Sequence, residues 1–170
     1  MKADTQSPDD VVASPIGTAD IPQIANIELL FFAYRAFTGD PDRILTRFGF
    51  GRAHHRALFF VSRRPGMTVA ELIAILGITK QSLSRVLREL IQSGHIRQLT
   101  GRSDRRQRRL YPTRAGHELI LELSRPQSRR IADALDACGL GDAESVACFM
   151  QAMMDKQDRK LLDALAQSAE

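Results

Sequence analysis

The chain has 170 residues, of which 44% are hydrophobic and 26% are charged, and its formal net charge is +4. This length and composition fit one globular domain with a core, or a small domain with an extension. The apolar runs are too short to cross a bilayer, and the first twenty residues lack the apolar region of a signal peptide, so the sequence predicts a cytoplasmic protein without a membrane partner.

The charges are unevenly distributed along the chain. Residues 51–115 contain 14 Lys or Arg and 3 Asp or Glu, whereas the remainder contains 10 basic and 17 acidic residues. A basic middle segment between acidic ends is typical of a surface that binds a polyanion. The sequence therefore favours nucleic acid as the partner.

The N-terminal part predicts a flexible arm followed by a helix. Residues 1–20 contain no long apolar run, and their composition is that of a flexible arm. Asp20 is of the residue type that caps helices, and apolar residues recur at helical spacing over residues 21–37. We therefore expect a helix over these residues that begins after Asp20.

Two turn signals divide the next part of the chain. Asp40 followed by Pro41 is a cap and a first-turn proline, which predicts that the first helix ends and a short helix follows over residues 43–48. Residues 51–64 predict a further helix, which ends at the Pro-Gly pair that follows.

A pair of helices joined by a short turn comes next. Thr68 and Glu71 form a capping-box pattern before an apolar helix, Gly77 ends that helix, and Thr79 caps the following one. The second helix carries an apolar stripe, and its opposite side is polar. The polar side contains Lys80, Gln81, Ser84, Arg85 and Arg88.

The chain then changes from a helical period to an alternating one. Residues 95–99 and 108–112 alternate polar and apolar side chains, as half-buried strands do, on either side of an arginine-rich turn over residues 100–107. This pattern predicts a β-hairpin with a basic tip.

The sequence of the C-terminal part predicts helices whose apolar side must pack on another protein surface. Thr113 caps a long helix, which Pro126 restarts or kinks. The last segment, over residues 142–167, has an apolar stripe that must pack on another surface. Because the middle of the chain is complete by itself, a second copy of the chain is the predicted partner.

Two helices followed by a hairpin form a winged helix-turn-helix, in which the second helix enters the major groove and the wing reaches the backbone or the minor groove. Gln81 suits an adenine edge, and Lys80 or Arg85 suits guanine or phosphate, while serine hydroxyls suit phosphate oxygens. The predicted double-stranded-DNA-binding residues are Thr79, Lys80, Gln81, Ser82, Ser84, Arg85, Arg88, Arg102, Asp104, Arg105 and Arg106.

The chain resembles the MarR family of bacterial transcription regulators. The resemblance rests on the order of helices, on the core LGITKQSLSRVLRELIQSGHIRQL, on the wing GRSDRRQRRLYPTRAG and on the long terminal helices. The family's Asp-x-Arg wing motif corresponds to Asp104 and Arg106, which implies that the aspartate steadies the wing and the arginine enters the minor groove. The family's Thr-x-x-Gly motif corresponds to Thr113 and Gly116.

The predicted fold is mainly α with a small β-hairpin. We expect a flexible arm over residues 1–20, N-terminal dimerisation helices over 21–50, a winged helix-turn-helix over 51–115 and C-terminal dimerisation helices over 116–170.

The resemblance also implies a homodimer that binds a pseudo-palindromic operator, usually as a repressor. In many family members, binding of a small molecule, often an aromatic acid, releases the protein from DNA. Such a ligand binds between the dimerisation helices and the DNA-binding lobe. Candidate lining residues are Phe31, Tyr34, His54 and His55, for which core packing or simple exposure is the alternative interpretation.

No cofactor or metal is expected. Cys138 and Cys148 have neither a CxxC pattern nor a nearby histidine pair, which argues against zinc and predicts two small buried apolar residues. Oxidant-sensing members of the resembled family carry their reactive cysteine in the N-terminal helices, unlike this chain.

Three other functions are alternatives to that of a sequence-specific regulator. An enzyme would need convergent catalytic groups, but the four histidines are scattered and no Ser/His/Asp or glycine-rich phosphate motif is present, so no catalysis is expected. A sequence-indifferent, nucleoid-type protein would bind DNA with a steep salt dependence and no sequence preference. A winged helix used only for protein interaction would not bind DNA at all.

Overall fold

The computed structural model describes residues 15–100, 108–139 and 143–167. The chain forms two compact units, Met1–Ala36 and Phe37–Glu170, whose boundary lies inside the first helix. The elements are α1 (Ile24–Leu45), the 3-10 helix η2 (Thr46–Phe48), α2 (Arg52–Arg63), β1 (Met67–Thr68), α3 (Val69–Leu76), α4 (Lys80–Gln92), β2 (Ile96–Thr100), β3 (Arg108–Pro112), α5 (Arg114–Ala137), α6 (Glu144–Met153) and α7 (Lys156–Ala166).

Helix α1 runs without a break past the predicted stop, so the expected end at Asp40 and Pro41 is wrong. A proline inside a helix deprives the carbonyl four residues earlier of its partner. Here that carbonyl belongs to Phe37, and the side-chain amide of Gln127 donates to it over 3.4 Å. Pro41 is itself fully buried. The helix therefore continues past the proline because tertiary packing buries the ring and a side-chain amide replaces the missing hydrogen-bond donor.

The start of α1 also differs from the prediction. The helix begins at Ile24, and the Asp20 carboxylate accepts a hydrogen bond from the backbone N–H of Gly17 over 3.0 Å instead of capping the helix. Asp20 thus stabilises a turn ahead of the helix.

The helix-turn-helix forms as predicted. Thr68 Oγ1 accepts from the backbone N–H of Glu71 over 3.2 Å, and Glu71 Oε2 accepts from the backbone N–H of Thr68 over 2.7 Å. Gly77 ends α3 with a φ of 60°, a left-handed conformation that favours glycine. Thr79 Oγ1 accepts from the backbone N–H of Ser82 over 3.2 Å and starts α4.

The predicted hairpin is confirmed and has an additional strand. β2 and β3 pair antiparallel, and the short β1 pairs with the other edge of β3, so the strand order is β1-β3-β2. Arg109, on β3, donates from Nη1 to the carbonyl of Gly66 over 3.0 Å and fastens this third strand. The predicted wing residues Arg102, Asp104, Arg105 and Arg106 lie outside the described residues.

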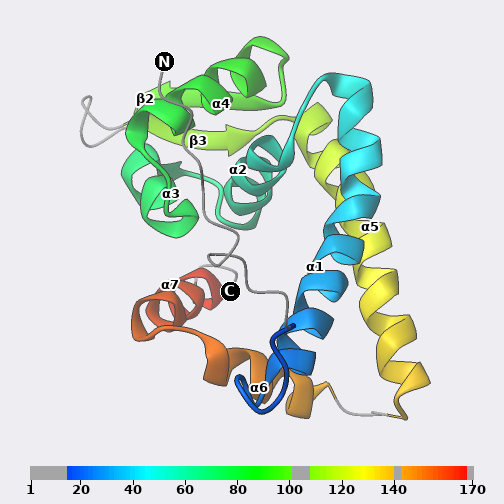
Figure 1. Cartoon of the computed structure of the whole chain (residues 1–170). Helices are drawn as coiled ribbons and strands as arrows, with labels where there is room; N and C mark the ends of the chain where they lie inside the picture. Colours follow the sequence, from blue (N-terminus) through cyan, green and yellow to red (C-terminus); the bar gives the residue numbers. More distant parts are fainter. Residues whose placement is uncertain (1–14, 101–107, 140–142, 168–170) are drawn as a thin grey trace, which may run out of the picture. The chain divides into compact units, whose positions relative to one another are not determined.

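Helix α2 occupies the centre of the second unit. It packs against α3, α4, α5 and β3, and Figure 1 shows it between the helix-turn-helix and α5. Among the described residues, the fully buried side chains of the core around it are aliphatic, apart from the thioether of Met67. Its fully buried side chains include Leu58, Val61, Leu72, Leu83, Leu90, Ile96, Leu110 and Leu123.

The Thr-x-x-Gly motif joins the wing to α5. Thr113 Oγ1 accepts from the backbone N–H of Gly116 over 3.1 Å and donates to the carbonyl of Gly94 over 2.6 Å. A Cβ atom at Gly116 would lie 2.0 Å from the carbonyl oxygen of His95, so only glycine fits. The threonine caps α5 as predicted, while the glycine allows the helix to lie against the start of β2.

The C-terminal elements differ in detail from the sequence expectation. Helix α5 continues through Pro126 to Ala137 without restarting. The last segment divides into α6 and α7, with an extended Met154 between them. No helix in the described part of the chain is long and apolar enough to span a membrane.

Candidate nucleic-acid interface

Helix α4 is held by one face and leaves the other face open. Its Leu83, Val86, Leu87 and Leu90 are buried in the core. This amphipathic division fixes the rotation of the helix about its own axis. The polar side is therefore directed to solvent by the packing of the apolar side.

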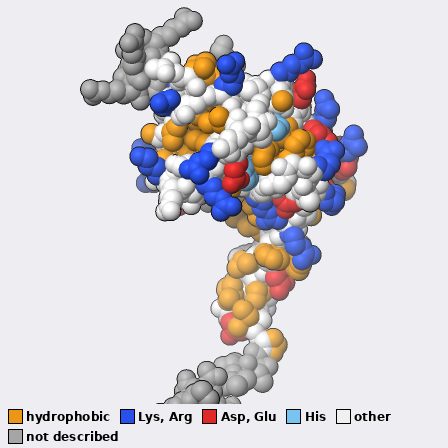
Figure 2. Space-filling view, turned by 90° about the horizontal axis from the view of Figure 1, so that it is seen from above, with side chains coloured by type: hydrophobic (Ala, Val, Ile, Leu, Met, Phe, Trp, Pro, Cys, Tyr) orange, Lys and Arg blue, Asp and Glu red, His pale blue; other side chains and the backbone are white. Residues whose placement is uncertain are grey.

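The open face of α4 gathers most of the predicted DNA-binding residues. All of them are exposed, and together they line a shallow surface hollow. Figure 2, seen from the side of Figure 1 on which α4 lies, shows many Lys and Arg side chains over this face and fewer Asp and Glu. The residues of the hollow, here named the α4 face, are Lys80, Gln81, Ser82, Ser84, Arg85 and Arg88.

The hydroxyl groups on the α4 face are not equivalent. Ser84 Oγ donates to the carbonyl of Lys80 over 2.7 Å, which uses the only proton it could offer to a phosphate. Ser82 Oγ instead accepts from Thr79 Oγ1 over 2.9 Å, so its own proton remains for another acceptor. Ser82, beside the exposed N-terminus of α4, is thus the better phosphate donor of the two.

A chain of hydrogen bonds links the α4 face to helix α2. Arg85 Nε donates to Glu89 Oε1 over 3.0 Å, and His54 Nε2 lies 2.6 Å from Glu89 Oε2. The backbone N–H of Gly51 donates to His54 Nδ1 over 3.0 Å. The hydrogen bonds from Arg85 and His54 hold the pKa of the Glu89 carboxyl below its ordinary value. Glu89 was not among the residues predicted from the sequence, although an acidic residue on a basic helix face is a signal of such a role.

The four predicted ligand-lining residues belong to different units. Phe31 and Tyr34 are exposed on α1 in the first unit. His54 stacks on Phe50 with ring centroids 4.8 Å apart. Its two ring nitrogens are hydrogen-bonded within the protein, to the backbone N–H of Gly51 and to the carboxylate of Glu89. Burial lowers the pKa of His55, and the negative charge of the nearby Asp42 partly offsets this lowering. A ligand site shared by the four residues stays a prediction.

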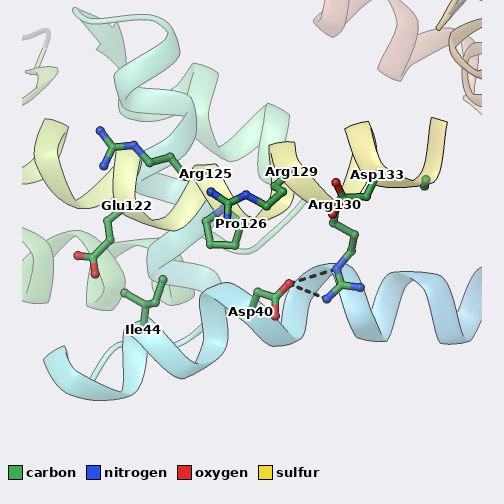
Figure 3. Close-up of a pocket in the computed structure, with 9 residues that line it drawn as sticks. Asp40, Ile44, Glu122, Arg125, Pro126, Arg129, Arg130 and Asp133 are labelled. Atoms are coloured by element: carbon green, nitrogen blue, oxygen red, sulfur yellow. Dashed lines mark hydrogen bonds and ion pairs between the residues drawn. The ribbon is translucent and has the colours of Figure 1, made fainter. Parts of the chain in front are cut away.

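A groove that the sequence did not predict lies between the end of α1 and α5. The carboxylate of Asp40 faces Arg130, whose Nη2 lies 2.7 Å from Asp40 Oδ2 (Figure 3). The hydrogen bond from Arg130 lowers the pKa of Asp40. The lining residues are Asp40, Ile44, Glu122, Arg125, Pro126, Arg129, Arg130, Asp133 and Ala134.

The cysteines do not occupy the predicted positions. Cys138 and Cys148 are both free and exposed, so the expectation that they are buried is wrong for the single chain. Cys148 lies on α6, whose apolar side chains are largely uncovered, and Cys138 follows the exposed end of α5. Among the described residues, no group of three or more His, Cys, Asp or Glu side chains is placed to hold a metal ion.

Comparison with known proteins connects this arrangement to a family. The sequence model of the MarR family matches residues 48–107. The HTH-type transcriptional regulator PetP of Rhodobacter capsulatus is 49% identical over 134 residues, which cover 79% of this chain and 81% of the relative.

Solved structures agree with this match. A crystal structure of MarR is 27% identical and superposes with a TM-score of 0.52, covering 88% of this chain and 98% of that one. Streptococcus pneumoniae FabT in complex with DNA shares the fold, with 17% identity, a TM-score of 0.63 and coverage of 86% of this chain and 99% of that one. The relatives are regulators and not enzymes, and the chain belongs to the MarR family of DNA-binding, helix-turn-helix transcriptional regulators.

Proposed function

We propose that this regulator recognises a specific pseudo-palindromic operator as a homodimer, with the α4 face in the major groove. The observation that carries the proposal is the exposed, basic and polar α4 face on a helix whose rotation the core fixes. A helix presented in this way brings its N-terminal side chains, Lys80 and Gln81, to base edges. The wing residues Arg102, Arg105 and Arg106 are proposed to contact the flanking DNA, and Asp104 is proposed to steady the wing that presents them.

The homodimer is supported by apolar surface that a monomer would leave in water. On α6, Phe149 is 63% exposed and Met153 is 56% exposed, and Met150 lies beside them. Exposed apolar groups of this size on one helix are typical of an interface with another chain. A second copy is the economical occupant, because two recognition helices in one dimer match two half-sites of an operator.

Repression and release by a small ligand complete the proposal. An aromatic acid bound beside Phe31, Tyr34, His54 and His55 is one candidate effector. The charged groove along α5 offers a second location for an acidic ligand. Since the DNA of a bacterial regulator lies in the cytoplasm, that compartment is the proposed site of action.

Selection of bound duplexes from a random-sequence pool tests sequence specificity. A specific regulator enriches a pseudo-palindrome and binds it far more tightly than a shuffled duplex at the same salt concentration. A nucleoid-type protein instead enriches no sequence and gives equal affinities with a steep salt dependence.

Replacing Gln81 with alanine is expected to weaken operator binding by about 1–3 kcal/mol and binding to shuffled DNA much less, because a base-edge contact carries sequence information. Competition titrations with both duplexes measure the two losses. Gln92→Ala is the matched control, since Gln92 is an exposed glutamine at the other end of the same helix. Equal losses of binding free energy on both duplexes would mean that Gln81 contacts the DNA backbone and not a base edge.

A further inference from the structure

An acidic side chain on a surface that meets DNA needs an explanation, because its charge repels phosphates. Glu89 is such a residue, four positions after Arg85 on α4, and its side chain is 36% exposed. We infer that Glu89 is a positioning residue, which His54 holds in place and which in turn presents Arg85 to the DNA. This inference rests on the proposed contact between the α4 face and DNA.

The two oxygens of Glu89 have separate tasks. Oε2 lies 2.6 Å from His54 Nε2, and Oε1 accepts from Arg85 Nε over 3.0 Å. The carboxylate therefore joins a residue of α2 to a residue of the α4 face. An ordinary surface ion pair at this spacing has no such second anchor and contributes little to stability.

His54 is itself fixed in orientation and in tautomer. The backbone N–H of Gly51 donates to Nδ1, so Nδ1 is unprotonated, and Nε2 carries the proton that it donates to Glu89. The imidazole stacks on Phe50 with an interplanar angle of 12°, and its side chain is only 12% exposed. Glu89 is thus tied to a rigid and largely buried ring on a neighbouring helix.

The hydrogen bond from Arg85 to Glu89 determines which edge of the guanidinium is available to DNA. Nε, on the side edge, is engaged by Glu89, while the side chain as a whole is 81% exposed. The end of the guanidinium with its two Nη nitrogens is the part that makes bidentate contacts to guanine or phosphate. A pre-oriented arginine loses less freedom on binding than a free one, which favours the DNA sites that match its position.

If Glu89 positions Arg85, removing its carboxylate changes operator affinity in the direction opposite to that expected from charge repulsion alone. Removing a carboxylate near DNA raises affinity for every sequence if repulsion is its only role. If Glu89 positions Arg85, Glu89→Ala instead weakens operator binding by about fivefold to tenfold, while affinity for shuffled DNA stays equal or rises. The ratio of the two affinities is the readout, because a structural role alone would not change it.

A double-mutant cycle completes the test on the full-length protein. Arg85→Ala should weaken operator binding in the wild-type background and have little further effect in the Glu89→Ala background. Glu89→Gln is a second variant of nearly unchanged shape, whose amide accepts from one partner only, and it should lower the same ratio. Thermal unfolding of each variant verifies that the fold is intact.

Glu118→Ala is the matched control. Arg114 Nε donates to Glu118 Oε1 over 2.9 Å at the same spacing on α5, and no histidine of the described ranges is hydrogen-bonded to this carboxylate. This variant removes the same charge and should leave the ratio of operator to shuffled affinity unchanged.

Two results would overturn the inference. One is an equal rise of both affinities in Glu89→Ala, and the other is independent, additive effects of Arg85→Ala and Glu89→Ala on operator binding. A wild-type protein that prefers no sequence would instead contradict the proposed function itself, which the random-pool selection detects before any variant is made.

Discussion

Replacing Gly116 with alanine is expected to destabilise the protein by about 3 kcal/mol or more, near the upper end for overpacking substitutions. The new Cβ would lie 2.0 Å from the backbone oxygen of His95 and 3.2 Å from Leu58 Cδ1. A backbone oxygen cannot move aside as a flexible side chain can. The start of β2 and the N-terminus of α5 would separate, so the wing would lose its support. Urea unfolding at a fixed protein concentration measures the loss.

Gly39→Ala is the control for this substitution. Gly39 lies inside α1, and a Cβ atom there would meet nothing within 4 Å. An alanine should stabilise the helix by roughly 0.5–1 kcal/mol, because glycine gives the unfolded chain more freedom. Similar stabilities for the two variants would mean that the contact between Gly116 and His95 is not tight in solution.

The double variant Phe149→Glu with Met153→Glu is expected to be monomeric and to bind the operator about a hundredfold or more weakly. Both side chains are exposed on one side of α6, and charges there cannot be buried against a second copy. A monomer engages one half-site and loses the advantage of two linked contacts. Sedimentation at micromolar concentration and operator titration measure the two effects.

The opposite side of α6 supplies the control. Ala147→Glu with Gln151→Glu adds the same charge at the same spacing, and both residues are exposed in the chain. This variant should remain dimeric. If the Phe149 and Met153 variant also remained dimeric with full operator affinity, α6 would not form the interface.

The elements that sequence reasoning predicted well are those specified by near neighbours. Thr68 with Glu71, and Thr79 with Ser82, bond across three residues, so their pattern is visible in a short stretch of sequence. The apolar stripe of α4 is equally local and predicted the rotation of its polar side.

The features that were missed depend on distant partners. The continuity of α1 through Pro41 depends on Gln127, which is ninety residues from the carbonyl that it satisfies. His54 resembled a ligand residue because its partner Glu89 lies on another helix. β1 has only two residues, too few for an alternating pattern, and its register on β3 is set by tertiary packing.

Cleavage of DNA from a single position tests most directly whether α4 lies on the half-sites of a specific operator. A variant with Gln81→Cys, Cys138→Ser and Cys148→Ser would carry an iron chelate at position 81 alone, since the chain has two cysteines of its own. With the selected operator, the expected result is cleavage centred on two half-sites, about 10 base pairs or a multiple of that distance apart. Cleavage that spreads evenly along any DNA, or no cleavage of bound operator, would contradict sequence-specific recognition through α4.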